Sequence, residues 1–214
     1  MRIGVLGTGM VGHAIASRLV EIGHDVVMGS RTATNEKAVA WAESHPERAR
    51  AGTFAEAAAH GELLVNATGG TVSLEVLGAC GEGDLAGKVL VDVSNPIASY
   101  GPLRLEPVMG DSNAEQLQRA YPALRVVKSL NTMNCEVMVR PDSVAGQHDV
   151  FMAGDDEGAK ADVRALLESF GWPSGSIRDV GALEAARGLE MYLPFWISLR
   201  MTLGHNAFNI RVVT

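Results

Sequence analysis

The chain has 214 residues, of which 47% are hydrophobic, and it carries a formal net charge of −7 from 25 acidic and 18 basic side chains. This length suffices for one main domain with a buried core and a small extension. The acidic balance and the lack of any basic run argue against a nucleic-acid partner, which needs clustered Lys and Arg. Cys80 and Cys135 form neither a CxxC pair nor a ligand cluster, so we expect no disulfide and no metal site.

No segment of the sequence predicts export or insertion into a membrane. The first apolar run ends at Gly7 and is far too short for a signal peptide. The longest apolar stretch near the C-terminus, 192–203, is interrupted by Pro194 and Arg200 and is too short to span a bilayer. We therefore expect a cytoplasmic protein without membrane contact.

Short runs of Val, Ile and Leu alternate with segments of helical period, which is typical of a sheet buried by helices on both faces. The predicted strands lie, in chain order, at 3–6, 25–28, 63–67, 89–93, 125–129 and 150–153. This alternation predicts an α/β chain with a doubly wound Rossmann fold and a mostly parallel sheet.

The turn after the first predicted strand has the spacing GxGxxG. It opens an amphipathic helix that Gly23 ends, and a strand, turn and helix in this order are the context that a dinucleotide-binding motif requires. The first Gly makes the turn, the second lets backbone approach a pyrophosphate, and the third lets helix meet strand. The helix N-terminus adds N–H donors and partial positive charge. The predicted binding residues are Gly7, Thr8, Gly9, Met10, Val11 and Gly12.

The end of the second predicted strand indicates which nucleotide this turn holds. A site for NADH presents Asp or Glu there, because a carboxylate accepts a hydrogen bond from the ribose 2′-hydroxyl. This strand ends instead in Ser30, Arg31 and Thr32. Hydroxyls and a guanidinium donate hydrogen bonds to a 2′-phosphate, which a carboxylate would repel. The sequence therefore predicts binding of NADP(H), with Arg31 as a phosphate ligand.

Capping residues predict several later helices. Thr53 with Glu56, and Ser112 with Glu115, fit the capping box, in which side chains satisfy free backbone N–H groups of the first helical turn. The acidic run 155–157 favours the start of a further helix, since negative charge is stabilised at a helix N-terminus.

Small and polar residues follow the strand predicted at 63–67. Ala67, Thr68 and Gly69 lie at its carboxyl end, where small residues let a dinucleotide pass close to the backbone. We include all three among the predicted cofactor-binding residues. Thr68 could equally cap the next helix.

Asparagines follow the next two predicted strands, and we expect both strand ends to flank the nicotinamide. Asn95 ends the first of them. Asn131 and Asn134 either orient the carboxamide or the acceptor, or cap a short helix predicted within 132–139. Cys135 has no His or basic residue beside it, so we interpret it as packing or pocket wall and not as a nucleophile.

The segment 95–111 does not fit the simple alternation. It is punctuated by Pro96, Pro102, Pro107 and two glycines, which predicts an irregular connection after a strand. Long loops at such a strand end commonly cover a ligand, and a plain surface loop is the alternative.

We divide the chain into an NADP-binding Rossmann domain at 1–181 and a helical C-terminal extension at 182–214. The extension is rich in Met, Leu, Phe and Trp, which is too much apolar surface to stay exposed. We expect it to pack across a homodimer or over the acceptor pocket. Packing within its own chain is the alternative.

No Ser/His/Asp arrangement, carboxylate pair or metal motif stands out in the sequence, so no catalytic residue is assigned. Hydride transfer to a carbonyl needs a proton donor, whereas transfer to a flavin-like ring needs much less help from the protein. This favours a small-molecule redox acceptor that is itself like a cofactor.

These residues resemble the NADPH-dependent coenzyme F420 reductases, also called F420-dependent NADP oxidoreductases, nearly from end to end. The likeness includes the opening strand with its GTGxxG turn, the tip 29–31, the strand end 128–132, the helix entry 153–156 and the compact helical tail. The cytosolic reductase domain of the STEAP metalloreductases is similar to the chain in its Asn131-Thr132 and Gly154-Asp155 segments.

The resemblance implies hydride transfer between NADP(H) and coenzyme F420 or a related flavin. It implies that Thr8, Ser30 and Arg31 contact the adenosine 2′-phosphate end of the cofactor. It also implies that Met133 and Cys135 provide wall and backbone contacts near the nicotinamide.

Two alternatives remain open from the sequence. One is a short β-hydroxyacid dehydrogenase or pyrroline-carboxylate reductase, although those enzymes add a long helical domain, often with a catalytic Lys, and no Lys follows Arg178 here. The other is a non-catalytic NADPH-sensing module whose apolar tail binds a partner protein.

Overall fold

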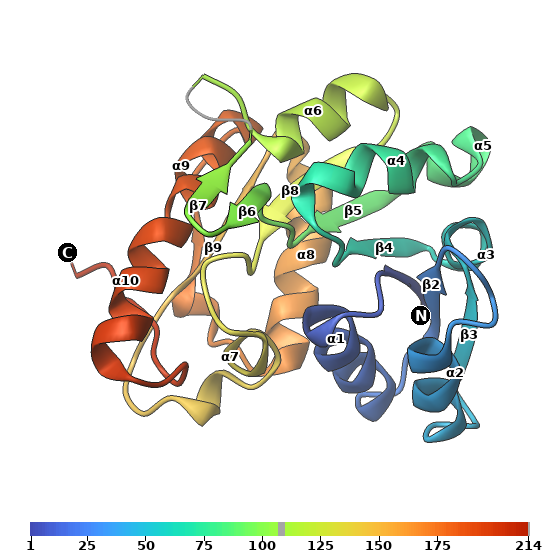
Figure 1. The fold of residues 1–214 in the computed structure, drawn as a ribbon, viewed down its shortest axis with the longest axis horizontal. Coiled ribbons are helices and arrows are strands. Elements are labelled where there is room, and N and C mark those ends of the chain that lie inside the picture. The colour runs from blue at the N-terminus through green and yellow to red at the C-terminus, as the bar shows by residue number, and fades with distance from the viewer. Residues whose placement is uncertain (107–109, 214) are drawn as a thin grey trace.

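An eight-stranded sheet forms the centre of the computed structural model, which describes residues 1–106 and 110–213 (Figure 1). The strand order is β10-β9-β8-β5-β4-β1-β2-β3. The strands are β1 (Arg2–Leu6), β2 (Asp25–Ser30), β3 (Ala49–Thr53), β4 (Leu63–Asn66), β5 (Val89–Asp92), β8 (Arg125–Ser129), β9 (Val150–Gly154) and β10 (Ile177–Asp179). The strands β3-β2-β1-β4-β5 follow the order of a Rossmann sheet, which confirms the predicted fold.

Two hydrophobic clusters place the helices on opposite faces of this sheet. Trp41 and Phe170 belong to the cluster under the first set of helices: α1 (Met10–Glu21), α2 (Glu36–Glu43), α7 (Cys135–Val139) and α8 (Glu157–Phe170). Phe54 and Leu117 belong to the cluster under the second set: α3 (Phe54–His60), α4 (Ser73–Gly78), α5 (Glu82–Leu85), α6 (Asn113–Ala120) and α9 (Ala186–Met191). Short 3-10 helices occur at Gly70–Val72, Pro141–Ser143, Ser174–Ser176 and Leu183–Ala185.

The six predicted strands are all present, but the sheet contains two more. β3 has the sequence ARAGT and β10 the sequence IRD, and neither carries the run of branched apolar residues that marks a buried strand. β9 pairs antiparallel with β8, whereas the other strand pairs of this sheet are parallel. Only the packing of the whole sheet decides this direction.

The predicted helix boundaries are confirmed by their hydrogen bonds. The Thr53 hydroxyl accepts from the backbone N–H of Glu56, whose carboxylate accepts from the N–H of Thr53. Ser112 likewise accepts from the N–H of Glu115. Gly23 adopts a φ of 93° after α1, the left-handed conformation that ends a helix most readily at glycine.

The segment predicted as an irregular connection at 95–111 contains regular structure, so that prediction was wrong in part. β6 (Ile97–Tyr100) and β7 (Leu103–Leu105) form a two-stranded antiparallel hairpin beside α9 and α10 (Figure 1). Short segments with few branched apolar residues and several prolines predict a loop. Pairing between the two halves supplies the hydrogen bonds that each half lacks. Pro107 lies outside the described residues.

The C-terminal extension carries α9 and α10 (Leu193–Leu203). Leu193 is buried, whereas four other large apolar side chains on or beside α10, Met191, Phe195, Met201 and Leu203, are exposed. The end of the chain returns to the sheet, where the side-chain amide of Asn209 donates to the backbone carbonyl of Asp149. In the described part of the chain we find no helix that is both apolar enough and long enough to cross a membrane.

Candidate functional site

The sheet changes direction of winding at β1, which lies between β2 and β4. The helix that follows β1 covers one face of the sheet, and the helix that follows β4 covers the other. A crevice therefore opens outside the carboxyl ends of β1 and β4, which is where open α/β sheets bind their ligands. The residues predicted to bind the cofactor come from strand ends, turns and the first turns of helices at this edge.

The glycine-rich turn has the shape that a pyrophosphate requires. Gly7 adopts a φ of 120°, which other residues rarely take. A Cβ at Gly12 would overlap the carbonyl of Gly7, so that α1 can approach β1 only if this residue is glycine. A Cβ at Gly9, in contrast, would meet no atom within 4 Å. The space beside Gly9, at the N-terminus of α1, is open for a diphosphate, and the turn fits the dinucleotide.

The tip of β2 divides its side chains between structure and surface. Ser30 is buried, and its hydroxyl donates to the carbonyl of Thr32 and accepts from the N–H of the same residue. Arg31 is exposed and lies near the carboxylate of Glu75 in α4, with 3.9 Å between guanidinium nitrogen and carboxylate oxygen. The exposed side chains of Arg31 and Thr32 can therefore reach a phosphate, while Ser30 shapes the turn.

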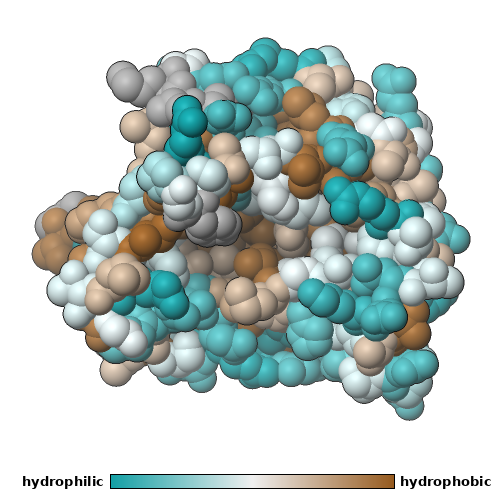
Figure 2. Space-filling model, viewed as in Figure 1, coloured by the Kyte–Doolittle hydropathy of each residue, from teal (hydrophilic) through white to brown (hydrophobic). Residues whose placement is uncertain are grey.

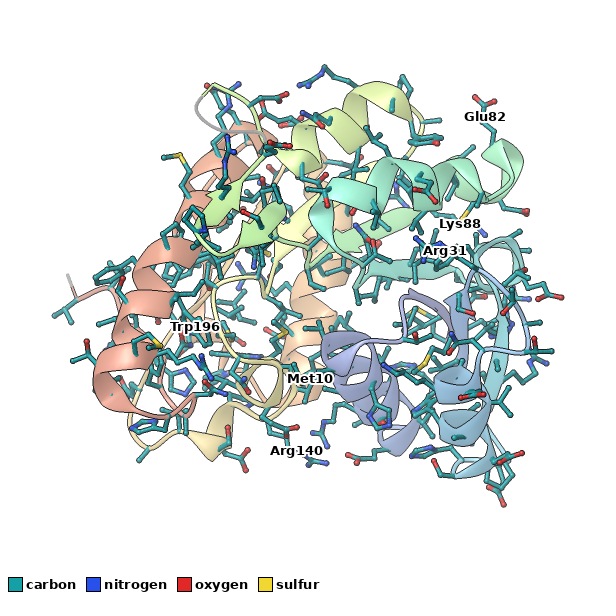
Figure 3. All side chains as sticks on the ribbon, viewed as in Figure 1. Met10, Arg31, Glu82, Lys88, Arg140 and Trp196 are labelled. Carbon is teal, nitrogen blue, oxygen red and sulfur yellow. The ribbon has the colours of Figure 1, made fainter. Side chains whose placement is uncertain are left out.

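A cavity of about 270 Å³ lies at the same edge, and Figure 2 shows a hollow with apolar residues in the middle of this face. Met10 at the start of α1 and Trp196 on α10 lie on opposite sides of it (Figure 3). The lining residues are Gly9, Met10, Val11, Ala67, Thr68, Gly69, Val93, Ser94, Asn95, Ile97, Asn131, Met133, Met138, Leu193 and Trp196. The structure thus brings together nine of the predicted cofactor-binding residues, from four separate segments.

Asn95 and Asn131 form one unit at the floor of this cavity. The amide of Asn131 donates to the side-chain oxygen of Asn95 at 3.0 Å and to the carbonyl of Leu189 at 2.9 Å. Asn95 donates in turn to the backbone carbonyl of Asn131. The side-chain oxygen of Asn131 and the indole N–H of Trp196 are buried without a partner among the described residues. Both are groups that a bound ligand with donors and acceptors could satisfy.

Of the two asparagines after β8, only one caps a helix in the described part of the chain. The side chain of Asn134 accepts from the N–H of Glu136 and caps α7. Asn131 caps no helix and joins the cavity to the C-terminal extension. Thr68 caps no helix either, because its hydroxyl donates to the side chain of Asn66 within the turn after β4.

Cys135 is half-buried at the first residue of α7 and does not belong to the lining of the cavity. Burial and the nearby carboxylate of Glu136 raise the pKa of its thiol. The thiol is therefore protonated near neutral pH, which agrees with a packing side chain and not with a nucleophile.

A buried charge cluster that the sequence did not predict lies beneath the cavity. Lys128 of β8 is fully buried, and its ammonium lies 2.9 Å from the carboxylates of both Asp92 and Glu190. Lys128 also donates to the backbone carbonyl of Ser94, which lines the cavity. Although burial by itself lowers the pKa of Lys128, the two carboxylates outweigh it and raise that pKa. The lysine is charged, and it ties the extension to the sheet.

Both carboxylates of this cluster are also held by neutral donors. Asp92 accepts from the side chains of Asn66 and Ser94. Glu190 accepts from the backbone N–H of Asn113 at the start of α6. Burial raises the pKa of Glu190, with the charge of Asp92 adding to the effect and Lys128 opposing it. The strand pattern of 125–129 conceals this cluster, because a single Lys in an apolar run is read as an exposed residue.

Metal ligation finds no support in the described residues. Within 1–106 and 110–213 there is no group of three or more His, Cys, Asp or Glu side chains that could hold a metal ion. The polar groups at the cavity are instead amides, hydroxyls and an indole.

Comparison with known proteins identifies the family of the chain. The family model described as NADP oxidoreductase, coenzyme F420-dependent, matches residues 2–96. The F420-dependent NADP reductase of Methanothermobacter marburgensis is 30% identical to the chain over 94% of its length, and the match covers 93% of the reductase. The chain belongs to the family of F420-dependent NADP oxidoreductases. It is thus an oxidoreductase that binds NADP(H).

Two further relatives extend the comparison within and beyond this family. A crystal structure of a candidate F420-dependent NADP reductase from Arthrobacter sp. FB24 superimposes with a TM-score of 0.94, at 44% identity and over 100% of both chains. The metalloreductase STEAP3 of Rattus norvegicus is 33% identical over 91% of the chain. The chain spans only 38% of the length of STEAP3.

Proposed function

We propose that this oxidoreductase transfers hydride between NADP(H) and coenzyme F420 or a related flavin-type acceptor. One observation carries the proposal: the cavity beside Gly9 is lined by apolar, amide and hydroxyl groups, and none of the described lining residues is an acid or a base. Reduction of a carbonyl requires a positioned proton donor, whereas a deazaflavin or flavin ring takes a hydride on carbon or nitrogen and a proton from water. The lining suits the second kind of acceptor.

The residues of the site divide into four roles under this proposal. The turn Gly7 to Gly12 and the N-terminus of α1 hold the pyrophosphate, with Thr8 and Met10 between the glycines. Arg31 binds the 2′-phosphate. Asn95, Asn131 and Met133 border the nicotinamide, which supplies the hydride when NADPH is bound. The indole of Trp196 offers the acceptor a planar surface and an N–H donor without a protein partner.

Mixing the purified protein with NADPH and coenzyme F420, and separately with flavin mononucleotide, tests the proposed reaction. Hydride transfer removes the absorbance of NADPH and of the acceptor together. We expect turnover with at least one of the two acceptors. Nucleotide binding without reduction of either acceptor would contradict the proposal and favour an NADPH-sensing module.

We also propose that α10 covers its apolar surface in a homodimer. Met191, Phe195, Met201 and Leu203 are 48 to 72% exposed on or beside this helix, and monomeric proteins rarely leave such a cluster in water. The mass measured by light scattering behind a sizing column is expected to be twice that of the 22.6 kDa chain. Introducing a charge with Phe195→Glu should yield monomers, whereas a monomeric native protein would rule the dimer out.

A further inference from the structure

Two side chains of opposite charge face each other across the mouth of the dinucleotide crevice. Arg31 projects from the end of β2 toward α4, where Figure 3 shows it, and Glu75 lies in the first turn of α4. β2 and α4 belong to different walls, because α4 follows β4 on the other side of β1. The guanidinium and the carboxylate are 3.9 Å apart, and both side chains are more than 70% exposed.

The pair occupies the place where the adenosine ribose of a dinucleotide has to lie. The pyrophosphate is held at the N-terminus of α1, and the adenosine end extends from there over the tip of β2. A 2′-phosphate bound by Arg31 would therefore come close to the carboxylate of Glu75. A ribose with a free 2′-hydroxyl would instead present a donor to the same carboxylate.

We propose that Glu75 supplies from α4 the ribose-reading carboxylate that β2 lacks, and that it sets the preference between NADPH and NADH. This inference rests on the proposed role of Arg31 as the phosphate ligand. The carboxylate of Glu75 competes with the 2′-phosphate for the guanidinium and repels the phosphate, so Glu75 weakens the binding of NADPH. The same carboxylate accepts a hydrogen bond from the 2′-hydroxyl of NADH, so it strengthens the binding of NADH.

A structural reason for Glu75 also exists, because an acidic side chain in the first turn of a helix is stabilised by the helix dipole. That role affects the stability of α4 and does not depend on which nucleotide is bound. A change in the ratio of the two affinities therefore separates recognition of the ribose from a role in α4 alone.

The experiment measures dissociation constants for NADPH and NADH, from nucleotide fluorescence, in the native protein, Glu75→Ala and Glu75→Gln. The matched control is Glu62→Ala, which removes an exposed carboxylate that pairs with Arg2 at 3.2 Å, before β4 and at the opposite edge of the sheet. We expect Glu75→Ala to bind NADPH about two- to fivefold more tightly and NADH about two- to fivefold more weakly, the range of an exposed charge interaction. Glu62→Ala should change neither constant.

Salt and the conservative variant sharpen the test. In about 1 M salt, where the Debye length is about 3 Å, the gain for NADPH should disappear. The loss for NADH should persist there, because a hydrogen bond is screened less than a distant charge. Glu75→Gln removes the charge but keeps an acceptor, so it should match Glu75→Ala with NADPH and lose less affinity for NADH.

Two failures can be told apart. Equal changes in the dissociation constants of both nucleotides in Glu75→Ala, or no change in either, would overturn the role of Glu75. This holds even if Arg31→Glu weakens the binding of NADPH. An unchanged NADPH affinity in Arg31→Glu would overturn the phosphate ligand itself.

Discussion

Replacing Lys128 with Met is expected to lower the free energy of unfolding by about 3 to 5 kcal/mol, the usual cost of removing one partner from a buried ion pair. The ammonium of Lys128 is fully buried between Asp92 and Glu190. Met is similar in length and apolar, so the change leaves two carboxylates facing each other without a cation. Urea denaturation at neutral pH measures the loss.

The loss should depend on pH in one direction. Burial already raises the pKa of Glu190, and removing Lys128 takes away the charge that opposes this rise. A carboxyl group whose pKa is raised by folding favours the folded state below its unfolded pKa and disfavours it as the pH rises. The Lys128→Met variant should therefore regain part of its stability at acidic pH, relative to the native protein measured at the same pH.

Two further variants control this prediction. Arg2→Met breaks an exposed pair with Glu62 and should cost less than about 1 kcal/mol. Combining Lys128→Met with Asp92→Asn and Glu190→Gln neutralises the cluster and should recover part of the loss. If Lys128→Met costs no more than Arg2→Met, the cluster does not hold the extension on the sheet.

Arg31→Glu is expected to weaken the binding of NADPH by roughly 10- to 100-fold, because the change removes hydrogen bonds to a charged group and adds a like charge. NADH has no 2′-phosphate, so its affinity should change far less. Fluorescence titration of both nucleotides measures the difference. Arg2→Glu is the matched control, since Arg2 is also exposed and paired with a glutamate but lies at the amino end of β1.

The salt dependence gives a second reading of the same prediction. A contact between a guanidinium and a phosphate at an exposed site weakens as salt is added, because the ions screen both charges. The native protein should lose NADPH affinity with salt more steeply than Arg31→Glu does. Equal NADPH affinity in the native protein and Arg31→Glu would show that the 2′-phosphate lies elsewhere.

The local structure of the proposed nucleotide half of the site could be predicted from the sequence because its determinants are local. The turn Gly7 to Gly12 lies between a strand and a helix that are its immediate neighbours, and the tip of β2 follows within the same unit. Glycine spacing, an amphipathic helix and the missing acid after β2 are all properties of one short stretch. The hydrogen bonds that the Ser30 hydroxyl makes to Thr32 within its own turn could not be predicted in this way.

The proposed acceptor half is different, because it is assembled from distant segments. Asn131 meets Asn95 and Leu189 across 36 and 58 residues, and Trp196 reaches the cavity from the extension. The hairpin of β6 and β7 also escaped prediction, since neither strand is apolar enough to be recognised without its partner. The spacing of residues along the chain carries no information about such long-range contacts.

The sequence by itself determined that a Rossmann unit would form, that a glycine-rich turn would join its first strand to its first helix, and that no carboxylate would end β2. Only the tertiary structure placed Glu75 opposite Arg31, paired β9 antiparallel with β8, and buried Lys128 between Asp92 and Glu190. Backbone periodicity and turn geometry act over a few residues, so they can be read in order. Charge pairing and burial act through space, and they appear only when the sheet and the extension have packed together.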